Sequence, residues 1–346
     1  MKKMRYIILL LIGFLVAPAA GNGRQMNGLK KIIKKEFTVS PDANLRLNNR
    51  FGDISCAIWD KNEIAIEVTI SVETTSETVA EKIFSRIDIA FKGSESKVEA
   101  ATSLAKGLNA KDHFSIDYKV MMPSAVFLDL SNKFGDVMIK ELHAKSTIRV
   151  EYGKAMLGKL HHGDNLLEVA FGSATVESMK GAVVLIQFSR MRLDYAGSLK
   201  LSSKYSDIHV GEVVMLEGTF EGGNIDLGKA SVLTLQGSFS NFDIAMVKQK
   251  INLDTKFGSC KVKTIDPGFK SLVVVNQHGS VEIAIPGEIS YTLDAETHFG
   301  SITFPKSRAF LSVMNVSTHD ELYKGTVGTN PTAIVKIRNE FGSIKL

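Results

Sequence analysis

The segment Leu128-Asp-Leu-Ser-Asn-Lys-Phe134-Gly-Asp-Val-Met-Ile139 decides the fold, because the chain repeats it. Apolar and polar residues alternate on both sides of a central Phe-Gly pair, which is the periodicity of a β-strand. Close copies centre on Phe51, Phe257 and Phe341. A repeat of this kind indicates one structural unit stacked on its neighbours.

Weaker copies fill the middle of the chain at nearly constant spacing. Each has an aromatic residue, a histidine or a glycine in the central position: Tyr152, Phe171, Phe188, Tyr205, Gly222, Phe239, His278 and Phe299. Counted from Phe134, the successive intervals between these positions are 18, 19, 17, 17, 17, 17, 18, 21 and 21. The last interval, from Phe299 to Phe341, is 42 and predicts two turns of 21 with an irregular one between.

This spacing predicts a mainly β, single-domain protein: a parallel β-solenoid, or β-helix, with about 17–21 residues per turn. In a coil that advances one strand width per repeat, each side chain lies above its counterpart in the previous turn, so aromatic residues stack on aromatic residues. The alternative is an antiparallel sandwich of hairpins, which gives no reason for a constant phrase. The Gly or Ser after the aromatic residue is expected at the bend, where small residues tolerate unusual φ.

Two stretches break the repeat. Residues 60–126 are expected to form a small α+β insertion that caps the solenoid, with strands at 62–72, 87–91, 98–102 and 114–121 and a helix at 74–87. Residues 305–334 are expected to loop out before the last strand. The predicted organisation is therefore a signal peptide at 1–19, the first solenoid strands at 20–59, the capping insertion at 60–126 and the solenoid proper at 127–346.

The first 19 residues are typical of a secretory signal. Lys2, Lys3 and Arg5 precede ten apolar residues at 7–16, and Ala17-Pro18-Ala19 supplies the small residues of a cleavage site. The alternative is a short membrane anchor, although ten residues are too few to span a bilayer. Cleavage would remove three of the five net positive charges and leave +2, which argues against nucleic-acid binding.

The quoted phrases resemble the DUF4097 family of adhesin-like proteins from bacterial envelopes. The most specific matches are Asn49-Arg-Phe-Gly-Asp-Ile54, the Met122-Pro123 pair before Leu128, and Tyr323-Lys-Gly-Thr-Val-Gly328. The resemblance implies a β-solenoid at the cell envelope and supplies no catalytic residues.

Candidate metal ligands are few. Asp53, Asp136 and Asp207 follow the Gly or Ser of the bend, and Asp53 and Asp136 lie on adjacent turns if residues 60–126 loop out. Two stacked carboxylates would suit Ca²⁺, but aspartate is also an ordinary turn residue. His161-His162 is the one histidine cluster and lacks further ligands nearby in sequence, which favours an exposed polar loop. His278 occupies an aromatic position and is expected to stack.

Other candidates are basic or contain sulfur. Lys30-Lys31 and Lys34-Lys35 could touch anionic lipid or form a solvated face. Three lysines precede the aromatic position and could form a basic stripe or serve solubility only: Lys133, Lys204 and Lys256. Cys56 and Cys260 fall at apolar positions, which favours buried free thiols over a disulfide.

No Gly-x-Ser-x-Gly, phosphate-loop or dinucleotide pattern occurs in the sequence. We therefore predict no catalytic, cofactor-binding or metal-binding residues, and no cofactor. The expected function is a non-enzymatic exported adhesin or scaffold, periplasmic or at the cell surface, that binds an unidentified envelope or extracellular glycan or protein. We expect no nucleic-acid partner and no membrane segment in the mature chain. The alternatives are a polysaccharide lyase or hydrolase and an envelope-stress or regulatory module.

Overall fold

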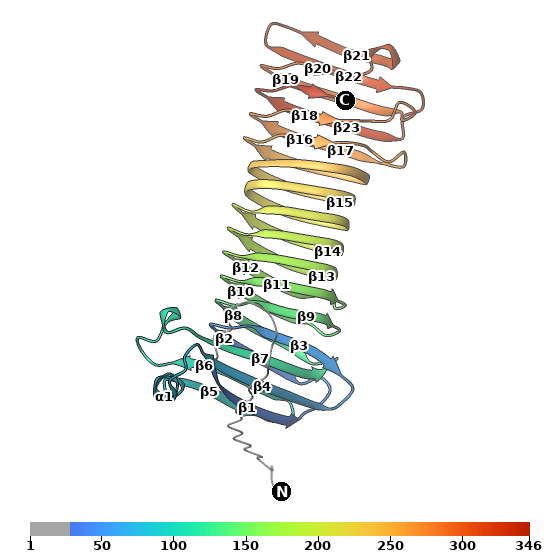
Figure 1. Cartoon of the computed structure of the whole chain (residues 1–346). Helices are drawn as coiled ribbons and strands as arrows, with labels where there is room; N and C mark the ends of the chain where they lie inside the picture. Colours follow the sequence, from blue (N-terminus) through green and yellow to red (C-terminus); the bar gives the residue numbers. More distant parts are fainter. Residues whose placement is uncertain (1–27) are drawn as a thin grey trace, which may run out of the picture. The chain divides into compact units, whose positions relative to one another are not determined.

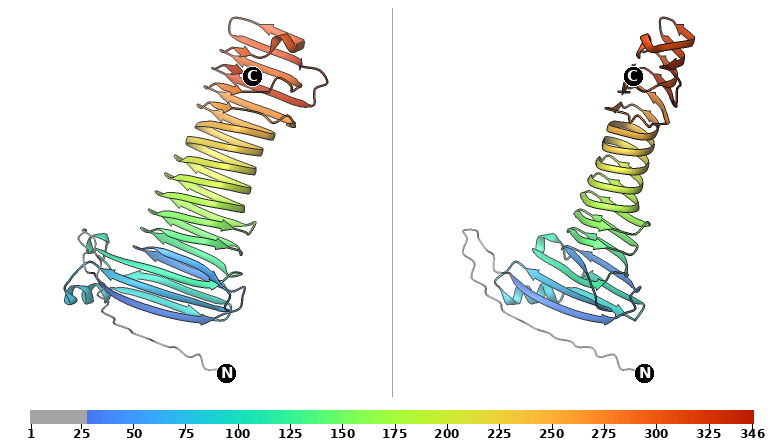
Figure 2. Two further views of the ribbon diagram at one scale, coloured as in Figure 1. Left: turned by 45° about the vertical axis from the view of Figure 1, so that its right-hand side comes forward. Right: turned by 90° about the vertical axis from the view of Figure 1, so that its right-hand side faces the viewer.

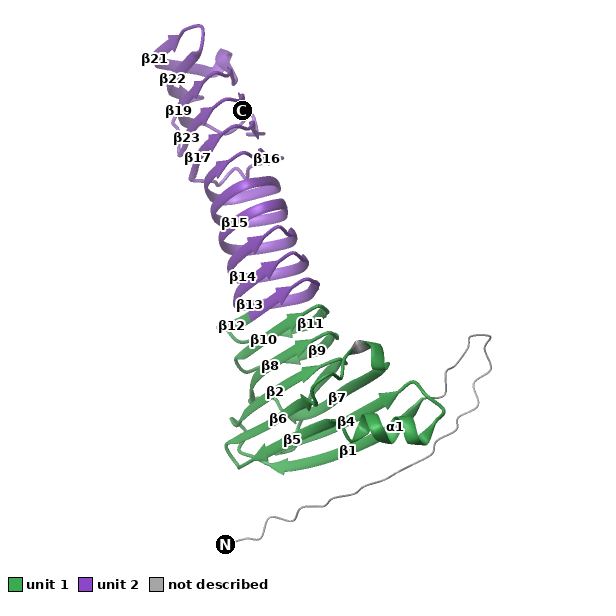
Figure 3. Ribbon diagram, turned by 90° about the vertical axis from the view of Figure 1, so that its left-hand side faces the viewer, with its two compact units in different colours: residues 1–166 green, residues 167–346 purple. Residues whose placement is uncertain are grey.

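The computed structural model describes residues 28–346, which form β-strands almost throughout, with a single α-helix among them. The predicted signal segment, residues 1–19, lies outside the described residues. The chain divides into two compact units, residues 1–166 and 167–346, coloured separately in Figure 3. The predominance of strands confirms the mainly β class.

The first unit holds β1 to β11, α1 and the start of β12 (Figure 1). Its elements are β1 (Leu29–Thr38), β2 (Asn44–Arg50), β3 (Ile54–Trp59), β4 (Glu63–Val72), α1 (Glu77–Phe84), β5 (Ile87–Gly93), β6 (Lys97–Leu104), the short 3₁₀ helix η1 (Ala110–Asp112), β7 (Phe114–Pro123), β8 (Phe127–Lys133), β9 (Val137–Leu142), β10 (Ser146–Glu151), β11 (Lys154–Leu160) and β12 (Asn165–Ala170).

Repeat copies in the first unit pair side by side and in parallel. Leu128 of β8 lies opposite Ser146 of β10, and Val137 of β9 lies opposite Ala155 of β11, so both pairs join strands that are one repeat apart in the sequence. Leu45 of β2 also lies opposite Leu128, across the whole insertion. Because these pairs are parallel, an antiparallel sandwich of hairpins is wrong for this part of the chain.

Residues 60–126 contain the predicted strands and helix. The helix is shorter than predicted: Ser76 caps it by accepting a hydrogen bond from the Val79 amide, and it ends at Phe84. Strands β4 and β7 pair antiparallel, as do β5 and β6. Strands β6 and β7 also pair in parallel with β2 and β3, so they cover the sides of β2 and β3 that β8 and β9 leave open.

The second unit holds β13 to β24. Its elements are β13 (Ser173–Gln187), β14 (Arg190–Lys204), β15 (Asp207–Lys256), β16 (Cys260–Val262), β17 (Ser271–Gln277), β18 (Val281–Ile283), β19 (Tyr291–His298), β20 (Ile302–Thr303), the 3₁₀ helix η2 (Lys306–Arg308), β21 (Ala309–Val316), β22 (Asp320–Val327), β23 (Ala333–Glu340) and β24 (Ile344–Lys345).

Strands β13, β14 and β15 pair in parallel at one constant offset, which places Val176 opposite Leu193 and Leu193 opposite Val210. Figure 2 shows this part of the second unit as a regular succession of strands. Apolar side chains recur at the same register positions and are buried, so each copy of the repeat covers the apolar residues of the copy beside it.

The end of the second unit departs from the predicted order. The last repeat copy, β23, lies between β17 and β19 and pairs in parallel with both. It does not continue the stack beyond β19, so the long interval from Phe299 to Phe341 is not two added turns. Residues 309–327 instead form β21 and β22, and β22 pairs antiparallel with the other side of β19.

Contrary to the prediction from the sequence, the bend at the aromatic position of most repeats does not depend on an unusual φ at the following Gly or Ser. The aromatic residue itself takes the left-handed conformation, with φ of 60° at Phe134 and 54° at Phe257. The following glycine is needed for close packing: a Cβ on Gly258 would lie 1.9 Å from the carbonyl oxygen of Ser240 in the neighbouring turn. At two positions where serine replaces glycine, the hydroxyl joins neighbouring copies of the repeat: Ser189 Oγ accepts from the Gly172 amide and Ser206 Oγ accepts from the Ser189 amide, both at 3.0 Å.

The two cysteines are buried free thiols, as predicted. Cys56 lies on β3 in the first unit and Cys260 on β16 in the second. Burial raises the pKa of each thiol to about 12.

Candidate functional site

The aspartates of the bend serve the backbone. Asp53 and Asp136 do come together: Asp53 Oδ1 accepts from the Asp136 amide at 2.8 Å, and Asp136 Oδ1 accepts from the Lys154 amide at 2.8 Å. Asp207 lies in the second unit and accepts from the amide of Asn224 at 3.3 Å. Each carboxylate therefore accepts a hydrogen bond from a backbone amide of the next copy of the repeat, which is an ordinary structural role for an aspartate at a bend.

The aromatic residues of the repeat form exposed columns within each unit. In the first unit Phe51, Phe134 and Tyr152 stack with ring centroids 5.0 Å apart. In the second unit Phe239, Phe257, His278, Phe341 and Phe299 form one continuous stack, which places His278 as predicted. Because each ring covers the face of the next, solvent meets the ring edges. Such a column stabilises the turns and offers few free faces for a ligand.

The lysines before the aromatic residues do not form a purely basic stripe. Lys133 pairs with Glu151 at 2.8 Å and lies over the rings of Phe134 and Tyr152. Lys204 pairs with Glu221 at 3.3 Å, and Lys256 lies opposite Gln277. Glutamates thus neutralise two of the three positions.

The four lysines near the start of β1 lie on opposite faces of the strand. Lys30 and Lys34 are exposed on one side, whereas Lys31 and Lys35 fall on the other, because successive side chains of a strand alternate. Lys34 also pairs with Glu67 at 2.7 Å, and this hydrogen bond raises its pKa. The four do not make a single patch for lipid.

His161 and His162 have separate partners. His162 Nδ1 accepts from the Asp164 amide at 3.0 Å. His161 instead lies against Glu141 and His143, two residues that the sequence analysis did not select. The repeat could have predicted this contact, because His143 and His161 are separated by one repeat interval in the sequence.

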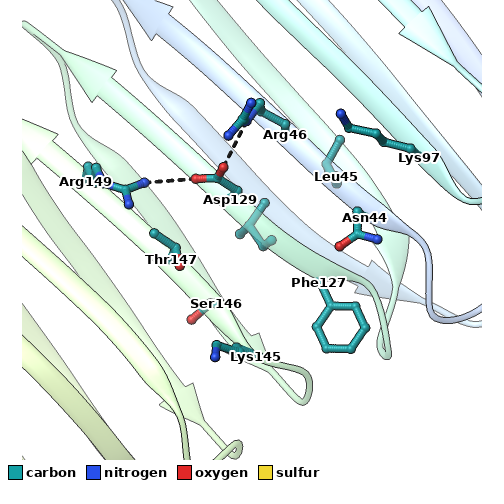
Figure 4. A pocket seen from close by; sticks show the side chains of 11 residues that line it. Asn44, Leu45, Arg46, Lys97, Phe127, Asp129, Lys145, Ser146, Thr147 and Arg149 are labelled. Atoms are coloured by element: carbon teal, nitrogen blue, oxygen red, sulfur yellow. Dashed lines mark hydrogen bonds and ion pairs between the residues drawn. The ribbon is translucent and has the colours of Figure 1, made fainter.

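A shallow groove in the first unit brings four basic side chains close to one exposed aromatic ring (Figure 4). It crosses β2, β8 and β10 and is lined by Asn44, Leu45, Arg46, Lys97, Phe127, Leu128, Asp129, Lys145, Ser146, Thr147 and Arg149. We call this set of residues the cationic groove. It carries four cationic side chains and a single carboxylate.

The repeat register builds the cationic groove. Arg46 lies opposite Asp129, and Asp129 lies opposite Thr147, so one position of the repeat supplies three of its residues. Asp129 accepts from Arg46 Nε at 2.9 Å and from Arg149 at 3.0 Å, which holds both guanidinium groups in place (Figure 4).

The remaining side chains of the groove add charge and an apolar surface. Lys145 is exposed in the bend between β9 and β10, and Lys97 pairs with Glu99 beside the groove. Phe127 is 40% exposed at the start of β8. The groove can therefore present fixed guanidinium donors, ammonium groups and an aromatic ring to one ligand.

Comparisons with known proteins give limited guidance. No family model and no curated protein matches the chain. Among solved structures, a "putative adhesin" from Parabacteroides distasonis is similar at 12% identity, over 75% of this chain and 94% of that one, with a TM-score of 0.33. A "putative lipid binding protein" from the same species is similar at 12% identity, over 73% and 96%, with a TM-score of 0.31.

A further "putative adhesin", from Bacteroides fragilis, is 14% identical over 91% of this chain and 96% of that one, with a TM-score of 0.23. At these TM-scores the likenesses carry no argument about function. Within residues 28–346, no helix has the length and apolar character needed to cross a membrane.

Proposed function

We propose that this chain is a non-enzymatic exported protein of the bacterial cell envelope, adhesin-like in role, that binds an acidic glycan through the cationic groove. The observation that carries the proposal is the lining of the groove, where four cationic side chains and one carboxylate surround an open surface with an exposed phenylalanine.

The chemistry of the groove suits a charged sugar. Guanidinium groups bind carboxylate and sulfate through paired hydrogen bonds, and Arg46 and Arg149 are already oriented by Asp129. The ring of Phe127 offers an apolar surface to the C–H face of a sugar. A shallow groove across strands fits a segment of a polymer better than an enclosed small molecule.

The scaffold that we propose is a parallel β-solenoid. In the first unit, residues 44–59 and 127–160 supply its turns and residues 60–126 cap them, whereas β1 (Leu29–Thr38) pairs antiparallel with β4 of that cap and is not a first solenoid strand. In the second unit, residues 173–304 and 333–346 supply the turns. The nearly constant offset of one repeat between parallel strands supports this proposal. Stacked turns hold their side chains at fixed spacing, which suits a repetitive ligand.

Export is proposed from residues 1–19, which have the pattern of a signal peptide, and the destination is the periplasm or the cell surface. A binding role without catalysis is supported by the aspartates Asp53 and Asp136, because their carboxylates accept backbone amide hydrogens.

The test is binding of the purified protein to polygalacturonate and alginate, with neutral dextran for comparison. We expect saturable binding to the acidic polymers that weakens between low salt and about 0.5 M NaCl, because salt screens charge. The double variant Arg46→Ala/Lys145→Ala should bind at least about tenfold more weakly, since the loss of even one charged hydrogen bond, worth about 1.5–3 kcal/mol, has that effect.

The matched control is Lys200→Ala/Lys204→Ala, which removes two positive charges from the second unit and should leave binding unchanged. Equal binding of dextran and acidic polymers, or equal losses in the two double variants, would count against the groove. Turnover of either polymer that Asp136→Asn abolishes would refute the non-enzymatic part of the proposal.

A further inference from the structure

Two histidines and a glutamate meet at the corner that follows β9 and β11 in the first unit. Strands β9 and β11 pair in parallel, with Leu142 opposite Leu160, and the His161 amide donates to the Leu142 carbonyl at 2.9 Å. His143 and His161 therefore occupy equivalent places on consecutive turns. Their rings meet edge to face with centroids 4.8 Å apart.

Both imidazoles turn the same nitrogen toward one carboxylate oxygen. His143 Nε2 lies 2.9 Å and His161 Nε2 lies 2.8 Å from Glu141 Oε1. The three ligand atoms all lie within 4.8 Å of one another. It is the one group of this kind found in residues 28–346.

The two N···O separations are close to those of a tetrahedral metal site. Zinc binds histidine nitrogen and carboxylate oxygen at about 2.0–2.2 Å, which places neighbouring ligand atoms roughly 3.3 Å apart. The present N···O distances of 2.8 and 2.9 Å need to open by only a few tenths of an ångström. The ion would replace the protons that now join the three groups.

The surroundings leave room for an ion and for water. The side chains of Glu141, His143 and His161 are 41%, 49% and 47% exposed. Two imidazoles and one carboxylate suit zinc, whereas Ca²⁺ and Mg²⁺ prefer oxygen ligands throughout. Three protein ligands leave a fourth position for water.

We propose that Glu141, His143 and His161 form a zinc-binding site that joins two consecutive turns of the first unit. This site is separate from the cationic groove and does not depend on the glycan proposal.

The experiment uses the purified chain without any histidine tag and zinc chloride as the probe. Equilibrium dialysis should show one saturable zinc ion that Mg²⁺ and Ca²⁺ in excess do not displace. Co²⁺ in place of zinc should give the strong visible absorption of a four-coordinate site. Each of His143→Ala, His161→Ala and Glu141→Gln should weaken binding at least about tenfold, the usual minimum for damage to a metal site.

His162→Ala is the matched control, because this histidine adjoins His161 in sequence and has its own partner. Its zinc affinity should equal that of the unchanged protein. Because all three proposed ligands are well exposed, the variants should keep the circular dichroism of the parent. The proposal is overturned if no saturable site is found, or if His162→Ala loses as much affinity as the three ligand variants.

Discussion

The aromatic residue of each repeat is in a conformation that costs free energy. Within residues 28–346, twelve non-glycine residues other than Asn330 have positive φ, and all of these except His113 and His278 are phenylalanine or tyrosine. A left-handed residue with a side chain costs about 1–2 kcal/mol. Stacking on the rings above and below, at about 0.5–1.5 kcal/mol for each pair, offsets this cost. Glycine, which has no such cost, occupies the position once, at Gly222.

Phe188 tests this balance. Its φ is 49°, and its ring stacks on Phe171 and Tyr205 at 5.2 and 5.3 Å. Phe188→Ala loses both stacks and keeps the strained backbone, so it should lower the free energy of unfolding by about 1–3 kcal/mol. Phe188→Gly loses the same stacks and relieves the strain, so it should be more stable than the alanine variant by about 1 kcal/mol.

Urea unfolding of the two variants measures the difference. Lys200 provides the control, because it lies within β14 at an ordinary strand conformation. At position 200 the order of stability should reverse, so that the alanine variant is more stable than the glycine variant. If alanine is also the better residue at position 188, the strain argument fails.

At the level of strands, the repeat predicted most of the parallel pairing. Phe134 and Tyr152 share a phrase, so their strands share a register, and the structure stacks them. The place of β23 was not predictable in this way. A repeated phrase says which strands can stack, but sequence order fixes their spatial order only where the connection is short. The connection before β23 is long and forms β21 and β22, which occupy the far side of β19.

The candidate sites were harder to predict than the fold. Arg46 and Asp129 lie far apart in the sequence and become neighbours only when residues 60–126 are set aside. Setting residues 60–126 aside is also what led the sequence analysis to expect Asp53 and Asp136 on adjacent turns. Arg46 and Asp129 are outward residues of the repeated phrase, and the histidine pair lies just outside it. The stacking of the core fixes where such outward residues lie but leaves their chemical type unconstrained, so the phrase alone does not predict either site.

One ion pair network links β19 and β23. Arg338 donates to both oxygens of Asp294 at 2.9 Å and to Glu296 at 2.9 Å, and all three side chains are only about a third exposed. Although burial by itself would raise the pKa of Asp294, the hydrogen bonds and charge of Arg338 lower it overall. Arg338→Met should therefore reduce the free energy of unfolding at about pH 7 by roughly 1–2 kcal/mol.

The effect should depend on pH. Because the Asp294 carboxyl has a lower pKa when folded, the unfolded chain binds more protons in acid. The stabilisation by the Asp294–Arg338 pair is fully present above the pKa that Asp294 has in the unfolded chain, about 3.9. It is lost as the pH falls through the lower pKa that Asp294 has in the folded chain. The difference between parent and variant should shrink from about pH 7 to about pH 3 in urea titrations. Arg192→Met, which removes the exposed pair with Asp194, is the control and should have little effect at either pH.

At the level of the whole molecule, each compact unit carries its own buried thiol. Cys56 is 2% exposed in the first unit and Cys260 is 1% exposed in the second. The proposed export would take the chain through compartments that favour disulfides, and both thiols are free in the structure. Their position within the stacked apolar residues explains this, because a thiol must ionise and be reached before it can be oxidised.

We expect neither thiol to react with dithionitrobenzoate in the folded protein, since burial raises both pKa values to about 12 and removes access. In concentrated urea both should react, and the intact mass of the purified protein should match the reduced chain. The single variants Cys56→Ser and Cys260→Ser then let the remaining thiol report on one unit at a time. As urea increases, Cys56 should become reactive toward the reagent only at the concentrations at which the protein loses circular dichroism. Rapid labelling of either thiol in the absence of urea would contradict the claim that the neighbouring strands bury it.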